Sequence, residues 1–426
     1  MRASALSFVV LVVVGAFLFP RHEAPLAAVP VKDQRVVYVS PDYSVLTMLA
    51  DGKGRDRITS GASSGGVLAQ PLLQEDTHFT WPVWSPDGRR LVVSRFSGLD
   101  QNQVAALSLI EPPSREERVL QISRHGLVDR VAEGTFHFPL WSPDGELLAL
   151  IAPNDGGTAL QLSVTDLDRR TVGVATGAPL YFTWSPDSTL IAIHHRERLL
   201  FRDSEGELFD TGRPSIRYRV PAISGDSETL AYVADLGDGE RLVTRKIATA
   251  EERDFTLVPT EAAFAFSPAS HDTLAIAIRS TERSAVYGGL TLIDVALGKE
   301  RIVYDDTVFG FWWSPDGTKI ALVGTNSDSF TLVVVDVATG EVSNLASFIP
   351  SPEFTTYIQF FDQFGLSQDI WSADSTAITI TGLMVVDGER TLTDKAWVVD
   401  VTGERQPVSL AEAVLAFFVP AEPRPK

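Results

Sequence analysis

The feature that most constrains the fold of this chain is a short turn motif that recurs along it. An apolar residue, most often Trp, precedes Ser, and Pro, Asp and Gly or Ser usually follow. The serines of successive copies are 39 to 58 residues apart. The copies are Trp84–Gly88, Trp141–Gly145, Trp184–Ser188, Ile223–Ser227, Phe266–Pro268, Trp313–Gly317 and Trp371–Ser375. A unit repeated at this period indicates a domain assembled from similar supersecondary units.

Each copy of the motif lies between strand-like runs. Pro restricts φ for a turn, Asp accepts hydrogen bonds from nearby backbone N–H groups, and Gly adopts left-handed backbone conformations. Around Trp313–Gly317, apolar runs precede the turn at Phe309–Trp313 and follow it at Ile320–Val323. A third run, Leu332–Val335, ends at an Asp, and a short fourth run follows. Four antiparallel strands per copy predict one blade of an all-β propeller, and no helical period is sustained after the N-terminus.

The aromatic and acidic residues of the motif are expected to be structural. They would pack the core and cap the turns, so function is sought in the loops between blades. The residues assigned to this structural motif are Trp84, Asp87, Trp141, Asp144, Trp184, Asp187, Asp226, Trp313, Asp316, Trp371 and Asp374.

Both ends of the repeat region carry an incomplete blade. Near the start, Arg35–Ser40, Ser44–Ala50 and Asp56–Ser60 are predicted as second, third and fourth strands without a first strand. Near the end, Ala413–Pro420 is predicted as a first strand without successors. If this strand becomes the innermost strand of the N-terminal blade, the ring closes and no sheet edge stays open. The prediction is a single propeller of eight blades, with seven blades as the alternative.

An apolar segment at the start of the chain predicts export. Residues 3–19 contain no charged side chain, and Arg2 precedes them. This arrangement is typical of a secretory signal, although the run is also close to the length of a membrane-spanning helix. Residues 1–30 are therefore predicted to be a signal peptide or a retained N-terminal membrane anchor with a linker. Residues 31–420 would form the propeller, in the periplasm or outside the cell, and residues 421–426 a tail.

Composition excludes several classes of function. The chain has 36 basic and 55 acidic side chains, a formal net charge of −19, so no nucleic-acid partner is expected. It has no cysteine, which excludes disulfides, thiol catalysis and Cys-ligated zinc. The adjacent His194 and His195 are expected on opposite faces of one strand, where they are poor joint metal ligands. No metal and no cofactor are predicted.

The turn motifs resemble the WD40-like PD40 repeat found in the propeller of TolB-like proteins. The segment Leu46–Thr59 also resembles the outer half of such a repeat, and the resemblance covers nearly all of residues 35–420. It implies the propeller fold and says little about function. TolB carries an α/β domain before a six-bladed propeller, whereas strands are expected here directly after the targeting segment. The partnership of TolB with a peptidoglycan-associated lipoprotein is therefore not transferred to this chain.

Two local patterns imitate functional motifs. Gly61–Gly65 fits the GxSxG pattern around Ser63, but a nucleophilic serine requires a strand-to-helix elbow on an α/β scaffold. The acidic turns Asn154–Gly157 and Asp235–Glu240 lack the spacing of an EF-hand and are better explained as hairpin turns. No catalytic residue is predicted.

One long connection is unusually aromatic for a propeller loop. Residues 347–366 are expected between the fourth strand of one blade and the first strand of the next, on one face of the ring. Its rings either pack onto the blades and close the channel mouth, or form an apolar docking patch for a protein, peptide or glycan. The candidate partner-binding residues are Phe348, Phe354, Tyr357, Phe360, Phe361 and Phe364. The loops 61–78 and 123–135 would form a polar rim on the same face.

Three functional hypotheses remain. The favoured one is an extracytoplasmic, non-enzymatic binding or scaffolding propeller. The second is a hydrolase or lyase with its site in the central channel, which requires acids, bases or a metal to converge there. The third is a structural or sensor component of a cell-envelope assembly.

Overall fold

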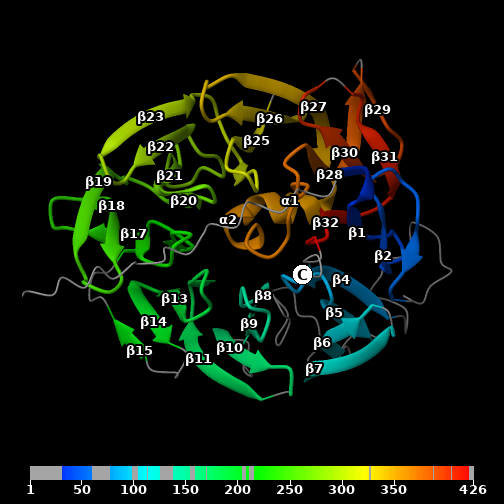
Figure 1. Ribbon diagram of the computed structural model, residues 1–426, viewed down its shortest axis with the longest axis horizontal. Coiled ribbons are helices and arrows are strands. Elements are labelled where there is room, and N and C mark those ends of the chain that lie inside the picture. The colour runs from blue at the N-terminus through cyan, green and yellow to red at the C-terminus, as the bar shows by residue number, and fades with distance from the viewer. Residues whose placement is uncertain are drawn as a thin grey trace, which may run out of the picture.

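The fold is an all-β ring. The computed structural model describes residues 31–59, 77–97, 104–112, 114–124, 138–153, 159–168, 170–203, 208–210, 215–325, 328–386, 388–403 and 405–421. Within these ranges the elements other than strands are a 3-10 turn, η1 (Val31–Asp33), and two helices, α1 (Pro352–Gln359) and α2 (Phe361–Phe364). The antiparallel sheets stand radially around one axis, and strands such as β4, β8 and β32 lie nearest the centre (Figure 1). This is the β-propeller architecture that the repeats predict.

Six sheets in the described part of the chain have four strands each. The first contains β32 (Leu415–Phe418), β1 (Arg35–Val39), β2 (Val45–Leu49) and β3 (Asp56–Arg57). The second contains β4 (His78–Trp84), β5 (Leu91–Ser97), β6 (Val104–Glu111) and β7 (Glu116–Arg124). The third contains β8 (Phe138–Trp141), β9 (Leu147–Pro153), β10 (Leu160–Asp166) and β11 (Thr171–Gly177).

The remaining four-stranded sheets continue around the ring. The fourth contains β12 (Leu180–Trp184), β13 (Leu190–His195), β14 (Arg198–Asp203) and β15 (Leu208–Asp210). The fifth contains β16 (Ala222–Ile223), β17 (Thr229–Asp235), β18 (Glu240–Lys246) and β19 (Glu252–Leu257). The sixth contains β20 (Ala262–Ser267), β21 (Ser270–Ile278), β22 (Leu290–Asp294) and β23 (Lys299–Tyr304).

A seventh, eight-stranded sheet completes the ring. Its strands are β24 (Gly310–Trp313), β25 (Lys319–Thr325), β26 (Phe330–Asp336), β27 (Val342–Pro350), β28 (Ala377–Val386), β30 (Lys395–Asp400) and β31 (Val408–Glu412), with β29 (Glu389–Arg390) paired to β28. It arises because β27 and β28 pair with each other, from Ser347 opposite Val385 to Pro350 opposite Gly382.

The position of a strand within its sheet decides its composition. The second strands lie between neighbouring sheets, so β13 and β17 are buried along almost their whole length. They are apolar runs rather than alternating patterns for this reason. The outer strands β19 and β23 are exposed along much of their length, and each carries three charged residues.

The two ends of the described chain pair with each other, as predicted. Strand β32 runs antiparallel to β1, with Val36 opposite Phe418 and Val39 opposite Leu415. The N-terminal sheet thereby gains its innermost strand from the C-terminal end of the chain, which closes the ring (Figure 1).

The repeated turn has one hydrogen-bond pattern. Ser314 Oγ donates to Asp316 Oδ1 at 2.7 Å and accepts from the backbone N–H of Lys319 at 2.9 Å. Asp316 Oδ1 also accepts from the backbone N–H of Thr318 at 3.0 Å, and Gly317 has φ 66°. The same Ser–Asp bond recurs in the copies at Ser85, Ser142, Ser185, Ser224 and Ser372. Each motif thus satisfies its own backbone groups locally.

Further bonds of the motif connect neighbouring repeats. The indole N–H of Trp371 donates to the carbonyl oxygen of Trp312 at 3.1 Å, and the backbone N–H of Asp316 donates to Ser375 Oγ at 3.1 Å. The tryptophan bond recurs from Trp141 to Val83. The motif residues therefore hold neighbouring repeats of the scaffold together.

Candidate functional site in the central cavity

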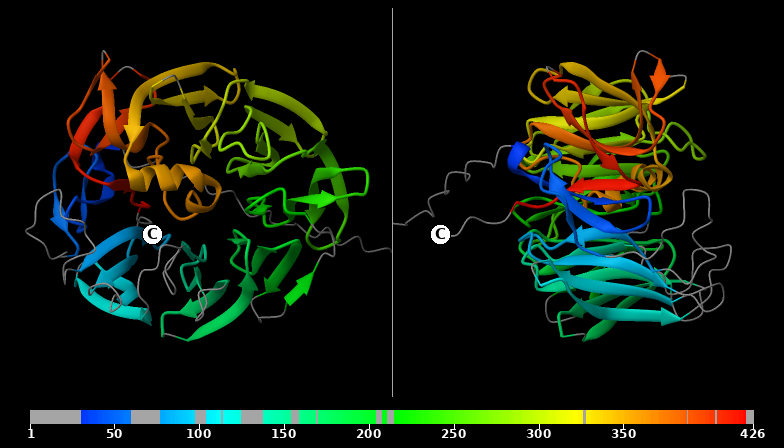
Figure 2. Two further views of the ribbon diagram at one scale, coloured as in Figure 1. Left: turned by 180° about the vertical axis from the view of Figure 1, so that it is seen from behind. Right: turned by 90° about the vertical axis from the view of Figure 1, so that its right-hand side faces the viewer.

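A helical insert occupies the centre of the ring (Figures 1 and 2). Ser351 caps α1 by accepting the N–H of Phe354 at 3.2 Å, and Pro352 follows at the first helical position. Ser351 Oγ also donates to the carbonyl oxygen of Val414 at 2.6 Å, which ties the helix start to the C-terminal strand region. At the same end, Tyr43 Oη donates to Glu353 Oε1 at 2.9 Å.

The insert was predicted as a connection without elements of its own, and this prediction was wrong. Phe354, Tyr357, Ile358 and Phe361 recur at helical spacing and are all buried. Together with a Ser-Pro-Glu start, this period was the available sequence signal for a helix. This helical period covers only a few residues, so the strand-like runs on either side of it outweighed it in the prediction.

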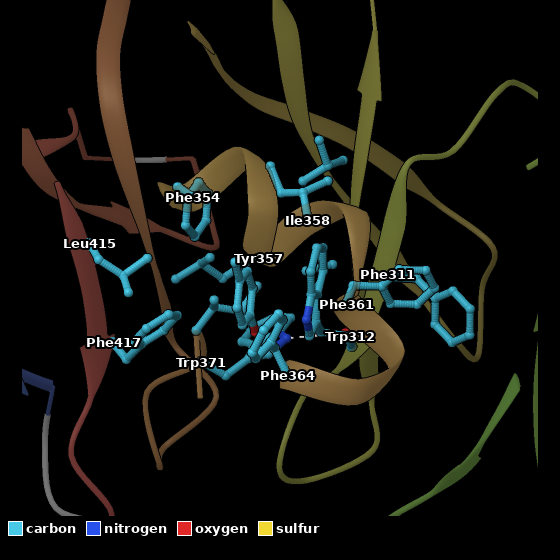
Figure 3. Packing of buried hydrophobic residues seen from close by; sticks show 14 of the residues in the cluster. Phe311, Trp312, Phe354, Tyr357, Ile358, Phe361, Phe364, Trp371, Leu415 and Phe417 are labelled. Carbon is cyan, nitrogen blue, oxygen red and sulfur yellow. Dashed lines mark hydrogen bonds between the residues drawn. The ribbon is translucent and has the colours of Figure 1, made fainter. Parts of the chain in front are cut away.

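The aromatic rings of the insert pack inward. Figure 3 shows Phe354, Tyr357, Phe361 and Phe364 converging with Trp312, Trp371 and Phe417 from the surrounding sheets. The exposed fractions of the candidate partner-binding residues are Phe348 0%, Phe354 1%, Tyr357 0%, Phe361 3%, Phe364 9% and Phe360 38%. Five of the six therefore do not form an exposed docking patch, because their rings are buried in the core. Only Phe360 remains accessible.

A buried ion pair fixes the second helix. Arg219 Nε donates to Asp362 Oδ2 at 2.9 Å and its Nη2 lies 2.8 Å from Asp362 Oδ1, a two-point pair in which both side chains are 5% exposed. Arg219 also donates to the carbonyl oxygen of Gln359 at 2.7 Å and to Tyr287 Oη at 3.0 Å, and its guanidinium lies 5.4 Å from the Phe360 ring centre. Arg219 thus joins the α1–α2 junction to the segment before the fifth sheet and to Tyr287, which lies between two strands of the sixth.

Two more charged groups surround this pair. Glu261 forms an ion pair with Arg279 at 2.8 Å and lies 3.5 Å from Arg219 Nε. Burial alone would lower the pKa of Arg219, but the carboxylates of Asp362 and Glu261 and the nearby Tyr287 raise it. Burial raises the pKa of Glu261, and the two arginines oppose this shift. The set converges in space from four separated segments, so sequence spacing gave no signal for it.

Beside α2 lies a cavity of about 530 Å³. Its lining includes Ser314, Pro315 and Pro268, which belong to the repeated turns, so it opens toward the turn face of the ring. The predicted site was on the other face, that of the connections between sheets. There the insert enters and fills the channel. Aromatic side chains make much of the cavity wall, and a cavity of this size suits a small ligand or one side chain of a larger partner.

Asp369 places a carboxylate in this cavity. Its side chain is accessible to solvent there, at a position that lies inside the ring of sheets. Burial within the ring raises the pKa of the Asp369 carboxyl to about 6. Among the described residues no hydrogen bond or ion pair to this carboxylate is found. A charged group held without a partner in such a place costs stability, which is a common property of binding and catalytic sites.

The backbone around Asp369 is firmly held. Its carbonyl oxygen accepts the N–H of Phe418 on β32 at 2.8 Å. The preceding Gln368 accepts from Tyr357 Oη at 3.0 Å through its carbonyl and donates from Nε2 to the carbonyl of Pro82 at 3.3 Å. The carboxylate is thus positioned by α1, by the C-terminal strand and by the second sheet.

Several predicted features lie outside the described residues. These are residues 1–30 with the targeting segment, Ser63 in the GxSxG pattern, most of the loops 61–78 and 123–135, and the turn Asn154–Gly157. No helix in the described ranges is long and apolar enough to cross a membrane.

The histidines and acidic groups of the described chain do not form a metal site. No group of three or more His, Asp or Glu side chains among these residues is arranged to hold a metal ion. His194 is buried, stacks on Tyr218 with ring centres 3.9 Å apart, and contacts the carbonyl oxygens of Arg219 and Ser215. It therefore supports the segment that carries Arg219.

Comparison with known proteins shows the fold alone. No family model matches the chain, and no curated protein matches it in sequence. The structure of dihydro-heme d1 dehydrogenase NirN in complex with DHE is similar at a TM-score of 0.55, with 14% identity over 94% of this chain and 78% of NirN. A eukaryotic initiation factor structure gives a TM-score of 0.51, with 13% identity over 92% of this chain and 99% of that chain.

The predicted likeness to TolB is present but weak. A TolB structure from Agrobacterium tumefaciens has 18% identity over 59% of this chain and 91% of that chain, with a TM-score of 0.38. At this score the likeness adds nothing beyond the propeller fold, and membership of the PD40 repeat family does not follow from it.

Proposed function

We propose that this protein is an exported, non-enzymatic binding or scaffolding propeller that recognises a segment of a protein, peptide or glycan in its central cavity. The observation that carries the proposal is the solvent-accessible cavity of about 530 Å³, with aromatic walls and one carboxylate that has no partner among the described residues. Apolar walls with a few fixed polar groups are the usual composition of ligand pockets.

The converging charges at the other side of α2 favour binding over catalysis. The guanidinium of Arg219 donates hydrogen bonds to Asp362, to a backbone carbonyl and to Tyr287. Groups paired in this way hold the insert in place and are not free to transfer protons. The insert forms the floor of the cavity, so the clamp preorganises a binding site.

Acid–base catalysis is the second candidate function. Asp369, whose burial raises its pKa to about 6, shares the cavity lining with Asp362. A carboxyl with such a pKa suits proton transfer near neutral pH. Mass spectrometry of any bound ligand after incubation distinguishes the two functions. Turnover that disappears in Asp369→Asn favours the enzyme.

The proposal also includes the number of blades and the export of the chain. Eight blades follow if the eight-stranded sheet is two blades that pair edge to edge, because each half contains its own Ser-Asp turn, at Ser314 and at Ser372. The first strand of the second half is reduced to a bridge between Trp371 and Ile378. Export, to the periplasm or the cell surface, rests on residues 3–19 alone.

A matched pair of leucine variants tests the binding proposal. Leu366 lines the cavity and is 43% exposed, whereas Leu392 is 98% exposed and is not part of the cavity lining. Leu366→Trp should fill the cavity, and Leu392→Trp adds the same indole elsewhere. Pools of tripeptides, oligosaccharides and amines are screened by thermal unfolding of the two variants and the unmodified chain.

We expect at least one pool to raise the melting temperature of the unmodified chain and of Leu392→Trp. At a ligand concentration of about 100 times Kd the shift should be on the order of 5 °C. Leu366→Trp should show no shift. Equal shifts in both variants, or no shift with any pool, would contradict a ligand in the cavity.

A further inference from the structure

We infer that the central cavity binds a cationic organic group, presented by a basic side chain of a peptide or by a small amine, between its aromatic walls and Asp369. This inference rests on the proposed binding function and names the chemistry of its ligand. It combines three independent observations: the charge of the lining, the aromatic walls and the fixed position of the carboxylate.

The lining carries negative charge without compensation. Among the described residues that line the cavity, the ionisable groups are Asp362 and Asp369, and none is Lys, Arg or His. The charge of Asp362 is neutralised by Arg219, whose guanidinium lies 2.8 Å away. Asp369 remains as a single unbalanced negative charge, so a cation is the complementary ligand.

The walls suit a cation better than they suit a polar neutral group. Phe266 and Trp313 line the cavity and are only half-buried, and Phe264, Trp312, Phe361 and Trp371 contribute behind them. The faces of aromatic rings attract cations, and this attraction is stronger at desolvated sites than at exposed ones. The half-exposed Ile223 and the exposed Leu366 would contact the apolar body of the same ligand.

The carboxylate is preorganised for this task. Backbone hydrogen bonds from Phe418 to Asp369 and from Thr379 to Ile370, both 2.8 Å, fix the segment on either side of the side chain. No ligand-induced rearrangement of the backbone is needed to bring the charge into the cavity, and a preformed site loses less affinity to ordering.

A charged probe and its neutral isostere test the inference directly. Calorimetric titration compares choline with 3,3-dimethylbutan-1-ol, which has the same shape without the charge. The unmodified chain should bind choline at least about tenfold more tightly than the alcohol. In Asp369→Asn this preference should disappear. Asp238→Asn, a change at an exposed aspartate outside the cavity lining, should keep it.

Two further arms identify the source of the cation and keep the test falsifiable. A tripeptide with a central Arg is titrated beside choline: tighter binding of the peptide assigns the site to a basic side chain, and tighter binding of choline assigns it to a free amine. Binding of either cation should weaken below about pH 6 as Asp369 takes up its proton, with Asp362 and Tyr357 the other titratable groups near it.

The possible failures are distinguishable. If a neutral or anionic ligand binds in a way that Leu366→Trp blocks, and Asp369→Asn leaves cation binding unchanged, the cavity is a binding site and the cation inference is wrong. If Leu366→Trp blocks no ligand of any class, both the proposed function and this inference are wrong.

Discussion

Asp362 and Asp369 stand seven residues apart, the first on the insert and the second just after it, and they line one cavity in opposite surroundings. Asp362 is 5% exposed and meets the guanidinium of Arg219 at two points. Asp369 faces the cavity, and no partner for it is found among the described residues. One carboxylate holds the insert in the ring, and the other is held by the insert. The contrast shows how a single segment provides both the structure of a site and its chemistry.

The largest expected loss of stability comes from breaking the ion pair between Arg219 and Asp362. Asp362→Ala would leave Arg219 buried without its counter-charge, which typically destabilises a protein by about 3–5 kcal/mol. Chemical denaturation measures this loss. The control is Asp238→Ala, which removes an exposed aspartate 3.7 Å from Arg241 and should change stability by less than about 0.5 kcal/mol.

A double substitution then separates charge from packing. Arg219→Leu combined with Asp362→Leu should recover much of the loss, since replacing both members of a buried pair leaves no unpaired charge. A double variant as unstable as Asp362→Ala would show that the bonds of Arg219 to Gln359 and Tyr287, rather than the ion pair, hold the insert.

At Asp369, removal of the charge should have the opposite effect on stability from its removal at Asp362. Asp369→Asn should stabilise the protein at pH 8, because the burial that raises the pKa of this carboxyl from 3.8 to about 6 penalises its charged form. The side chain is accessible to solvent in the cavity, so the gain is discounted to about 1 kcal/mol. Destabilisation by Asp369→Asn would mean that the carboxylate has a structural role, like that of Asp362.

The same change has a defined pH window. Between about pH 4 and pH 6 the folded chain holds a proton on Asp369 that the unfolded chain has released, so stability falls as pH rises through this range. The difference between the unmodified chain and Asp369→Asn should therefore vanish near pH 4 and be complete above about pH 7. Denaturation curves measured across this range check the sign.

The smallest expected effect on ligand binding lies at the other end of the insert, away from both aspartates. Tyr43→Phe removes the hydrogen bond to Glu353 at the start of α1. The expected loss is about 0.5–1.5 kcal/mol, as for a single partly buried bond. Because this change leaves the hydrogen bond from Tyr357 on α1 to the carbonyl of Gln368 in place, choline binding should stay within twofold of the unmodified chain. A large loss of binding would show that the two ends of the insert are coupled.

The fold was largely predictable because its signals are local. The turn around Ser314 and Asp316 contains its own hydrogen-bond partners within five residues, and the apolar runs beside it follow from burial between sheets. The pairing of β1 with β32 was also predictable, since each end of the chain shows an incomplete set of strands and open edges are unfavourable.

The candidate site was not predictable, because its partners are brought together over long distances. Arg219 and Asp362 are separated by 143 residues, and nothing in the sequence around either one indicates the other. The aromatic insert was recognised as unusual, but its sequence left open whether its rings pack onto the blades and close the channel mouth or form an exposed patch. Burial of Phe354 and Tyr357 in the centre of the ring decided between them.

By itself, then, the sequence determined the repeated unit, the class of fold and the closure of the ring, because turn geometry and strand burial depend on residues close together in the chain. Only the tertiary structure decided that the insert fills the channel, that Asp362 is paired, and that Asp369 faces a cavity where no described residue is its partner. Those properties depend on which side chains the closed ring brings together and on how much water it leaves between them.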